Sequence, residues 1–87
     1  MSLVDASVIV AILNEEPGFE ELEKRIEDAR PRLFVSPLVR FEAITAMMTI
    51  ELIRSGYKGD RQEIASKVRE LVDAFIEIMA ARTIVID

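Results

Sequence analysis

The amino-acid sequence predicts an α/β fold in which short buried strands alternate with pairs of helices. Three short apolar runs, at residues 3–5, 33–35 and 83–86, are separated by longer stretches with helical spacing. Near-continuous apolar strands joined by helices are typical of a parallel sheet with right-handed crossovers. We therefore expect three layers, built from a short parallel sheet of three strands and from four helices.

The first strand leads directly into a helix that is apolar on nearly every side. This helix is expected over residues 6–13, and the turn-forming residues 14–18 end it. A second helix is expected from Phe19 to about Ala29, because its apolar residues recur at spacings of three and four. The charged residues on its outer face are expected to be solvated.

The second strand is followed by a strong signal for a helix start. The strand at residues 33–35 precedes Ser36 and Pro37, and these residue types favour the cap and the first position of a helix. This third helix is expected to end near Ser55, because Gly56 can adopt the left-handed conformation that often follows a helix.

The last helix and strand follow a second cap signal. Asp60 and Glu63 have the spacing of a capping box, in which two side chains satisfy free backbone N–H groups. A third strand is expected at residues 83–86. The apolar stripe of the fourth helix consists of Ile64, Val68, Leu71, Val72, Phe75 and Met79.

Composition excludes several kinds of chemistry. The 87 residues suffice for one domain, and 51% apolar with 31% charged residues favours a folded protein over a disordered one. The chain has no cysteine and no histidine, so disulfides, thiolate zinc sites and Ser-His-Asp triads are ruled out. The net charge of −5 gives no footprint of a general nucleic-acid binder. Because no apolar run approaches the roughly 20 residues of a membrane span, a cytoplasmic location is expected.

Two carboxylates, Asp5 and Glu42, lie in apolar stretches, where the presence of a carboxylate calls for a specific structural or functional explanation. Asp5 follows the first strand, at the end of a parallel sheet where ligands gather, although aspartate is also a common N-cap. Burying Glu42 would cost several kcal/mol without a partner. Three readings stay open: a metal site shared by the two acids, a buried ion pair with an arginine, or a helix that turns this side outward. The small and apolar residues within about 60° of Glu42 on a helical wheel are Leu38, Thr45, Ala46, Thr49 and Ile53.

Two segments of the chain resemble a known family. The stretch from Leu3 to Pro17 resembles the opening of a PIN domain, and Val35-Ser36-Pro37-Leu38-Val39-Arg40-Phe41-Glu42-Ala43 resembles the segment that carries its second acidic residue. The whole chain resembles the VapC-type toxins of bacterial toxin–antitoxin pairs. The resemblance implies a metal-dependent endoribonuclease with Asp5 and Glu42 as its first two catalytic and metal-binding acids and Ser7 as a supporting hydroxyl. Mg²⁺ or Mn²⁺ is the implied ion, since these ions prefer oxygen ligands.

The chain also departs from this family pattern. PIN toxins continue after the third strand with further acidic residues, whereas nothing follows Asp87. We therefore expect residues 1–87 to form a single, C-terminally truncated PIN-like domain. Whether it is an enzyme alone is left open, because two carboxylates hold Mg²⁺ weakly.

The same resemblance implies binding partners. RNA is the implied substrate, and an antitoxin is an implied partner. An open edge on the first strand would favour a homodimer, because unpaired strand edges template pairing with another chain. The alternative is a non-catalytic module that dimerises or binds an antitoxin helix through apolar residues such as Ile44, Met47 and Met48.

Overall fold

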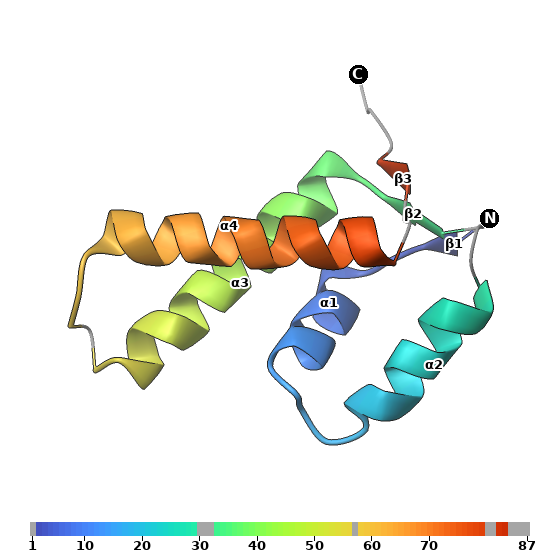
Figure 1. Cartoon of the computed structure of the whole chain (residues 1–87), viewed down its shortest axis with the longest axis horizontal. Helices are drawn as coiled ribbons and strands as arrows, with labels where there is room; N and C mark the ends of the chain where they lie inside the picture. Colours follow the sequence, from blue (N-terminus) through green and yellow to red (C-terminus); the bar gives the residue numbers. More distant parts are fainter. Residues whose placement is uncertain (1, 30–32, 57, 80–81, 84–87) are drawn as a thin grey trace.

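The computed structural model describes residues 2–29, 33–56, 58–79 and 82–83, and it has an α/β succession of elements (Figure 1). This succession confirms the predicted fold class and the four predicted helices. The elements in chain order are β1 (Ser2–Leu3), α1 (Ala6–Leu13), α2 (Phe19–Ala29), β2 (Leu33–Val35), α3 (Pro37–Arg54), α4 (Arg61–Ile78) and β3 (Arg82–Thr83).

The strands are very short and pair in parallel in the order β1-β2-β3. Leu3 of β1 is opposite Phe34 of β2, and Val35 of β2 is opposite Thr83 of β3. The expected first strand extended to Asp5, but β1 ends at Leu3, and one further backbone bond joins the Val4 N–H to the Phe34 carbonyl at 2.8 Å. Most of the expected third strand, residues 84–86, lies outside the described residues. The three-layer arrangement stays a prediction.

Local capping explains where the helices begin. Ser36 caps α3, since its hydroxyl oxygen accepts a hydrogen bond from the Val39 N–H at 3.1 Å, and Pro37 occupies the first turn as expected. Asp60 caps α4 by accepting from the Gln62 N–H at 2.9 Å. The expected capping box is only half formed, because the Glu63 carboxylate pairs with Lys67 instead of reaching back to the cap.

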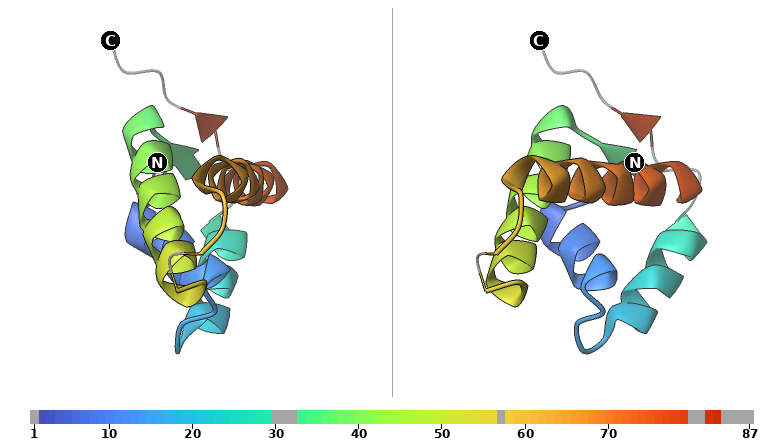
Figure 2. Two further views of the ribbon diagram at one scale, coloured as in Figure 1. Left: turned by 90° about the vertical axis from the view of Figure 1, so that its left-hand side faces the viewer. Right: turned by 60° about the vertical axis from the view of Figure 1, so that its left-hand side comes forward.

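The hydrophobic core is built mainly where α1, α3 and α4 meet beside the sheet. Helix α1 contacts the other three helices, and α3 packs against α4 (Figure 2). The largest of the fully buried side chains, Ile9, Val35, Met47 and Val72, come from α1, β2, α3 and α4. Helix α2 buries Ile26 and exposes the charged residues of its outer face, as expected.

Two expectations about apolar residues are corrected by the packing. Leu71, predicted to belong to the buried stripe of α4, is exposed. Ile44 and Met47, suggested as residues of a partner-binding surface, are buried in the core, and Met48 is half-buried against it. These three side chains therefore serve core packing. None of the helices in the described ranges has the length and apolar character that crossing a membrane requires.

Candidate acidic site

Asp5 is held at the junction of β1 and α1. Its backbone is extended, its carbonyl accepts the first bonds of the helix, and its Oδ1 accepts a hydrogen bond from the Ser7 N–H at 3.2 Å. The residue before it, Val4, is buried, whereas Asp5 is exposed. Asp5 is therefore an N-cap, as one reading of the sequence expected. The cap leaves other lone pairs free, because an ionised carboxylate offers about four acceptor positions.

Ser7 contacts Asp5 through its backbone. The donor in this contact is the Ser7 N–H, and the Ser7 side chain is exposed in the first turn of α1. The supporting role of the hydroxyl thus stays a prediction. The same N–H bond would nevertheless fix the orientation of the Asp5 carboxylate, whatever that carboxylate binds.

Glu42 lies in the second turn of α3 and is exposed, so the readings that bury it are wrong and the helix turns this side outward. The apolar residues on its side of the helix are exposed too: Leu38 by 61%, Phe41 by 66% and Ile53 by 58%. The core is contacted instead by Ala43 and Met47. Because α3 is apolar around most of its circumference, either side could have packed inward. Glu42 is solvated by water, so the cost of burying a carboxylate gives no argument for a bound metal.

The arginine near Glu42 is paired elsewhere. The Arg40 Nε and Nη2 donate to the two carboxylate oxygens of Asp73 on α4, at 2.6 and 2.8 Å. These hydrogen bonds from Arg40 hold the pKa of Asp73 below its usual value, although partial burial acts in the opposite direction. No local signal could reveal this pair, since its members are 33 residues apart.

Helices α1 and α3 begin at the same edge of the sheet. Strands β1 and β2 are parallel neighbours, and α1 and α3 follow their carboxyl ends within two or three residues. Helices α1 and α3 are also in contact. Asp5 at the start of α1 and Glu42 in the second turn of α3 therefore lie on two adjacent elements that leave the sheet at the same edge.

The cavities do not join the two acids. Asp5 lines a pocket of about 240 Å³ together with Arg25 of α2 and apolar side chains that include Val8 and Ile26. Glu42 does not line this pocket. In that same part of the chain, no group of three or more acidic residues is placed to hold a metal ion.

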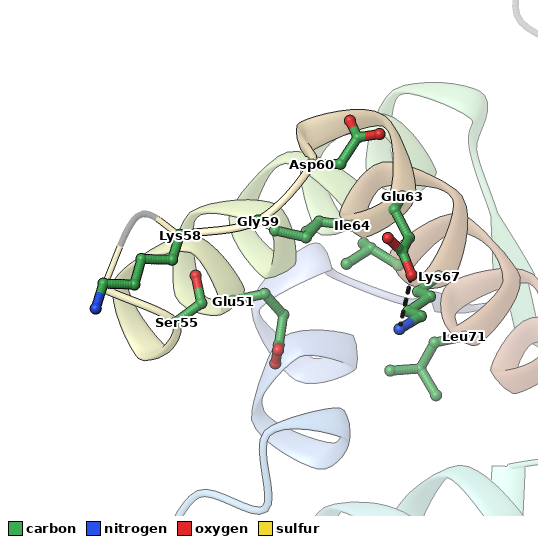
Figure 3. A pocket seen from close by; sticks show the side chains of 10 residues that line it. Glu51, Ser55, Lys58, Gly59, Asp60, Glu63, Ile64, Lys67 and Leu71 are labelled. Carbon is green, nitrogen blue, oxygen red and sulfur yellow. Dashed lines mark ion pairs between the residues drawn. The ribbon is translucent and has the colours of Figure 1, made fainter.

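A cavity of about 420 Å³ lies between the end of α3 and the start of α4, and neither acid lines it (Figure 3). Most of its charged side chains already have roles: Glu63 pairs with Lys67, Glu51 pairs with Arg54, and Asp60 caps α4. Glu51 is nine residues beyond Glu42, about 13 Å along the helix. This cavity is therefore separate from the candidate acidic site.

Comparison with known proteins defines the family. Residues 2–85 match the PIN domain, and the chain therefore belongs to the PIN domain family, as the resemblance of its acidic segments predicted. The chain is also 58% identical, over 87 residues, to a VapC ribonuclease of Rhizobium meliloti (strain 1021). The match covers the whole of this chain and 61% of the length of that relative. No solved structure matches the chain.

Proposed function

We propose that this protein is a VapC-like, metal-dependent endoribonuclease relative that acts on RNA in the cytoplasm. The observation that supports this most directly is its identity of 58% to a VapC ribonuclease, which extends across the segments that contain Asp5 and Glu42. The topology adds support, because the two acids belong to adjacent elements that leave the sheet at the same edge.

The chemistry of the two acids fits a hard divalent cation. Asp5 and Glu42 are exposed carboxylates, and carboxylate oxygens are the ligands that Mg²⁺ and Mn²⁺ prefer. When bound, such an ion activates water for attack on phosphorus and neutralises charge on the phosphate. Asp5 and Glu42 would hold the ion, and the Ser7 N–H would orient Asp5 toward it.

The decisive experiment measures Mn²⁺ binding by the electron paramagnetic resonance signal of the free ion. We expect Asp5→Asn and Glu42→Gln each to weaken the affinity for Mn²⁺ about tenfold or more. Asparagine caps helices as well as aspartate does, so Asp5→Asn removes the charge without removing the cap. Glu20→Gln, an exposed change on α2 with the same loss of charge, is the matched control. Affinities equal to that of the unchanged protein in both site variants would refute the proposal.

A second candidate function, a non-catalytic module that binds an antitoxin helix, is favoured by one groove. This groove of about 190 Å³ lies among α1, α2 and α4 and is lined by apolar side chains such as Leu13, Phe75 and Met79. Ile78 on its border is 68% exposed. An amphipathic helix can bury its apolar face in such a groove.

One set of measurements distinguishes the ribonuclease from the binding module. Whichever function is correct, Ile78→Asp is expected to abolish binding of an antitoxin peptide, as measured by calorimetry. If RNA cleavage in Mg²⁺ were present and lost in Glu42→Gln, the ribonuclease would be supported. If peptide binding occurred without any response to Mg²⁺ or to Glu42→Gln, the binding module would be the correct function.

A further inference from the structure

The last residue of α3 is hydrogen-bonded to the end of α1. The Arg54 Nη2 donates to the Asn14 Oδ1 at 2.7 Å, and the Arg54 Nη1 donates to the Glu51 Oε1 at 2.7 Å. Asn14 is the C-cap of α1, so the guanidinium lies at the negative end of that helix. Glu51, one turn earlier on α3, orients the guanidinium toward Asn14.

The opposite end of α3 is also held by an arginine. Arg40, in its first turn, makes the two-bond contact with Asp73 of α4. Within the described ranges, the side-chain hydrogen bonds between different elements are those of these two arginines. Helix α3 is therefore tied to α4 near its start and to α1 at its end.

The contact at Arg54 acts at a distance from the two acids. Asp5 caps the start of α1 and Asn14 caps its end, so the residues at the two ends of this helix are nine positions apart, about 13 Å. On α3, Glu42 and Arg54 are twelve positions apart, about 18 Å. A tie between the far ends of two crossed rigid helices fixes their crossing angle. That angle decides how far apart Asp5 and Glu42 lie.

Apolar packing alone fixes this angle less well. Helices α1 and α3 are in contact, and their buried residues include Ile9 and Ala43. Apolar contacts are not directional, whereas a short hydrogen bond from a guanidinium permits little change in distance or angle. The Arg54–Asn14 bond thus supplies the directional restraint between these two helices.

We propose that Arg54 is a positioning residue for the Asp5–Glu42 site, acting through its hydrogen bond to Asn14. This inference rests on the proposed function, because it concerns the metal affinity of those two acids. It predicts that the affinity for metal falls when the Arg54–Asn14 bond is removed. This holds even though Arg54 is more than ten residues from Glu42 on α3 and Asp5 belongs to another element.

The test uses the Mn²⁺ titration described above with variants at both ends of the bond. We expect Arg54→Ala and Asn14→Ala each to weaken Mn²⁺ affinity about three- to tenfold, less than the loss of a ligand. The double variant should be no weaker than either single one, because both remove the same bond. Asn14→Asp keeps an acceptor for the guanidinium and should retain the original affinity. Arg69→Ala is the matched control, because the Arg69 Nε donates to the Ala65 carbonyl within α4.

Thermal unfolding of the same variants distinguishes positioning from general stability. If Arg54→Ala and Asn14→Ala lower the melting temperature but leave Mn²⁺ affinity of the folded protein unchanged, while Asp5→Asn weakens it, the positioning role is wrong and the proposed function stands. If Asp5→Asn and Glu42→Gln also leave the affinity unchanged, both proposals fail. A coupled loss at Arg54 and Asn14 with rescue by Asn14→Asp supports the positioning role.

Discussion

Asp5 and Ser36 each cap a helix that begins directly after a strand, and they differ in how much of the side chain is buried. Ser36 is buried and its hydroxyl satisfies the Val39 N–H, whereas Asp5 is exposed and satisfies the Ser7 N–H. A serine in this position has one structural task. An exposed aspartate can cap the helix and still present oxygen atoms to a cation.

Replacing Ser36 by alanine is therefore expected to lower the free energy of unfolding by about 1 kcal/mol. The loss has a specific cause, because the partly buried Val39 N–H would lose its side-chain partner. Urea denaturation followed by circular dichroism measures it.

Ser66→Ala is the control for this change. Ser66 is exposed in the middle of α4, where alanine is the better helix former, so stability should stay equal or rise by a few tenths of a kcal/mol. Equal losses at both serines would show that the cap at Ser36 contributes nothing specific.

At the level of elements, the α3–α4 hairpin is joined by the Arg40–Asp73 ion pair. Both side chains are partly exposed, by 40% and 51%, so the pair contributes less than about 1 kcal/mol in spite of its two short bonds. Its main consequence is geometric, because two parallel bonds between planar groups permit one orientation. The pair holds the first turns of α3, which include Glu42, against α4.

The pair also makes stability depend on pH in a defined direction. Arg40 holds the pKa of Asp73 below its usual value in the folded state, so the unfolded chain takes up a proton at higher pH than the folded one. The contribution is complete above the unfolded pKa of about 4 and is lost as pH falls through the lower folded pKa. We expect Asp73→Asn to be less stable than the original protein at pH 7.

The difference between Asp73→Asn and the original protein should shrink as the pH falls below about 4 and should also shrink in 1 M salt. Urea denaturation at a series of pH values measures it. Glu70→Gln, an exposed change of equal charge on the same helix, should show no comparable trend. A difference that stayed constant with pH would contradict the ion-pair account.

For the whole molecule, the most consequential feature is the exposed apolar side of α3. Leu38, Phe41 and Ile53 lie on this side, and each is more than half exposed. Exposed apolar patches often mark sites of association. Together with the unpaired edge of β1 among the described strands, this side of α3 is the surface that we expect a second copy to cover in the proposed homodimer.

Light scattering at tens of micromolar protein tests this association. The original protein is expected to be a dimer, and Phe41→Glu is expected to be a monomer, because a charge cannot be buried there without a partner. Leu71→Glu changes an exposed leucine on α4 and should leave the dimer intact. A monomeric original protein would rule out the homodimer at this concentration.

Local sequence signals predicted most of the elements. The caps at Asp5, Ser36 and Asp60 and the glycine after α3 involve residues within four positions of one another, so their physics is visible in the sequence. The two acidic segments were likewise recognisable as belonging to a PIN domain, and the family match confirmed this.

Long-range packing settled what local patterns could not. Helix α3 is apolar around most of its surface, so only its contacts with α1 and α4 decided that Ala43 and Met47 face inward and that Glu42 meets water. The bonds from Arg40 to Asp73 and from Arg54 to Asn14 were hidden for the same reason, since each joins residues more than 30 positions apart. Helix starts follow from bonds between near neighbours, whereas orientation follows from the lowest free energy of the whole packed chain.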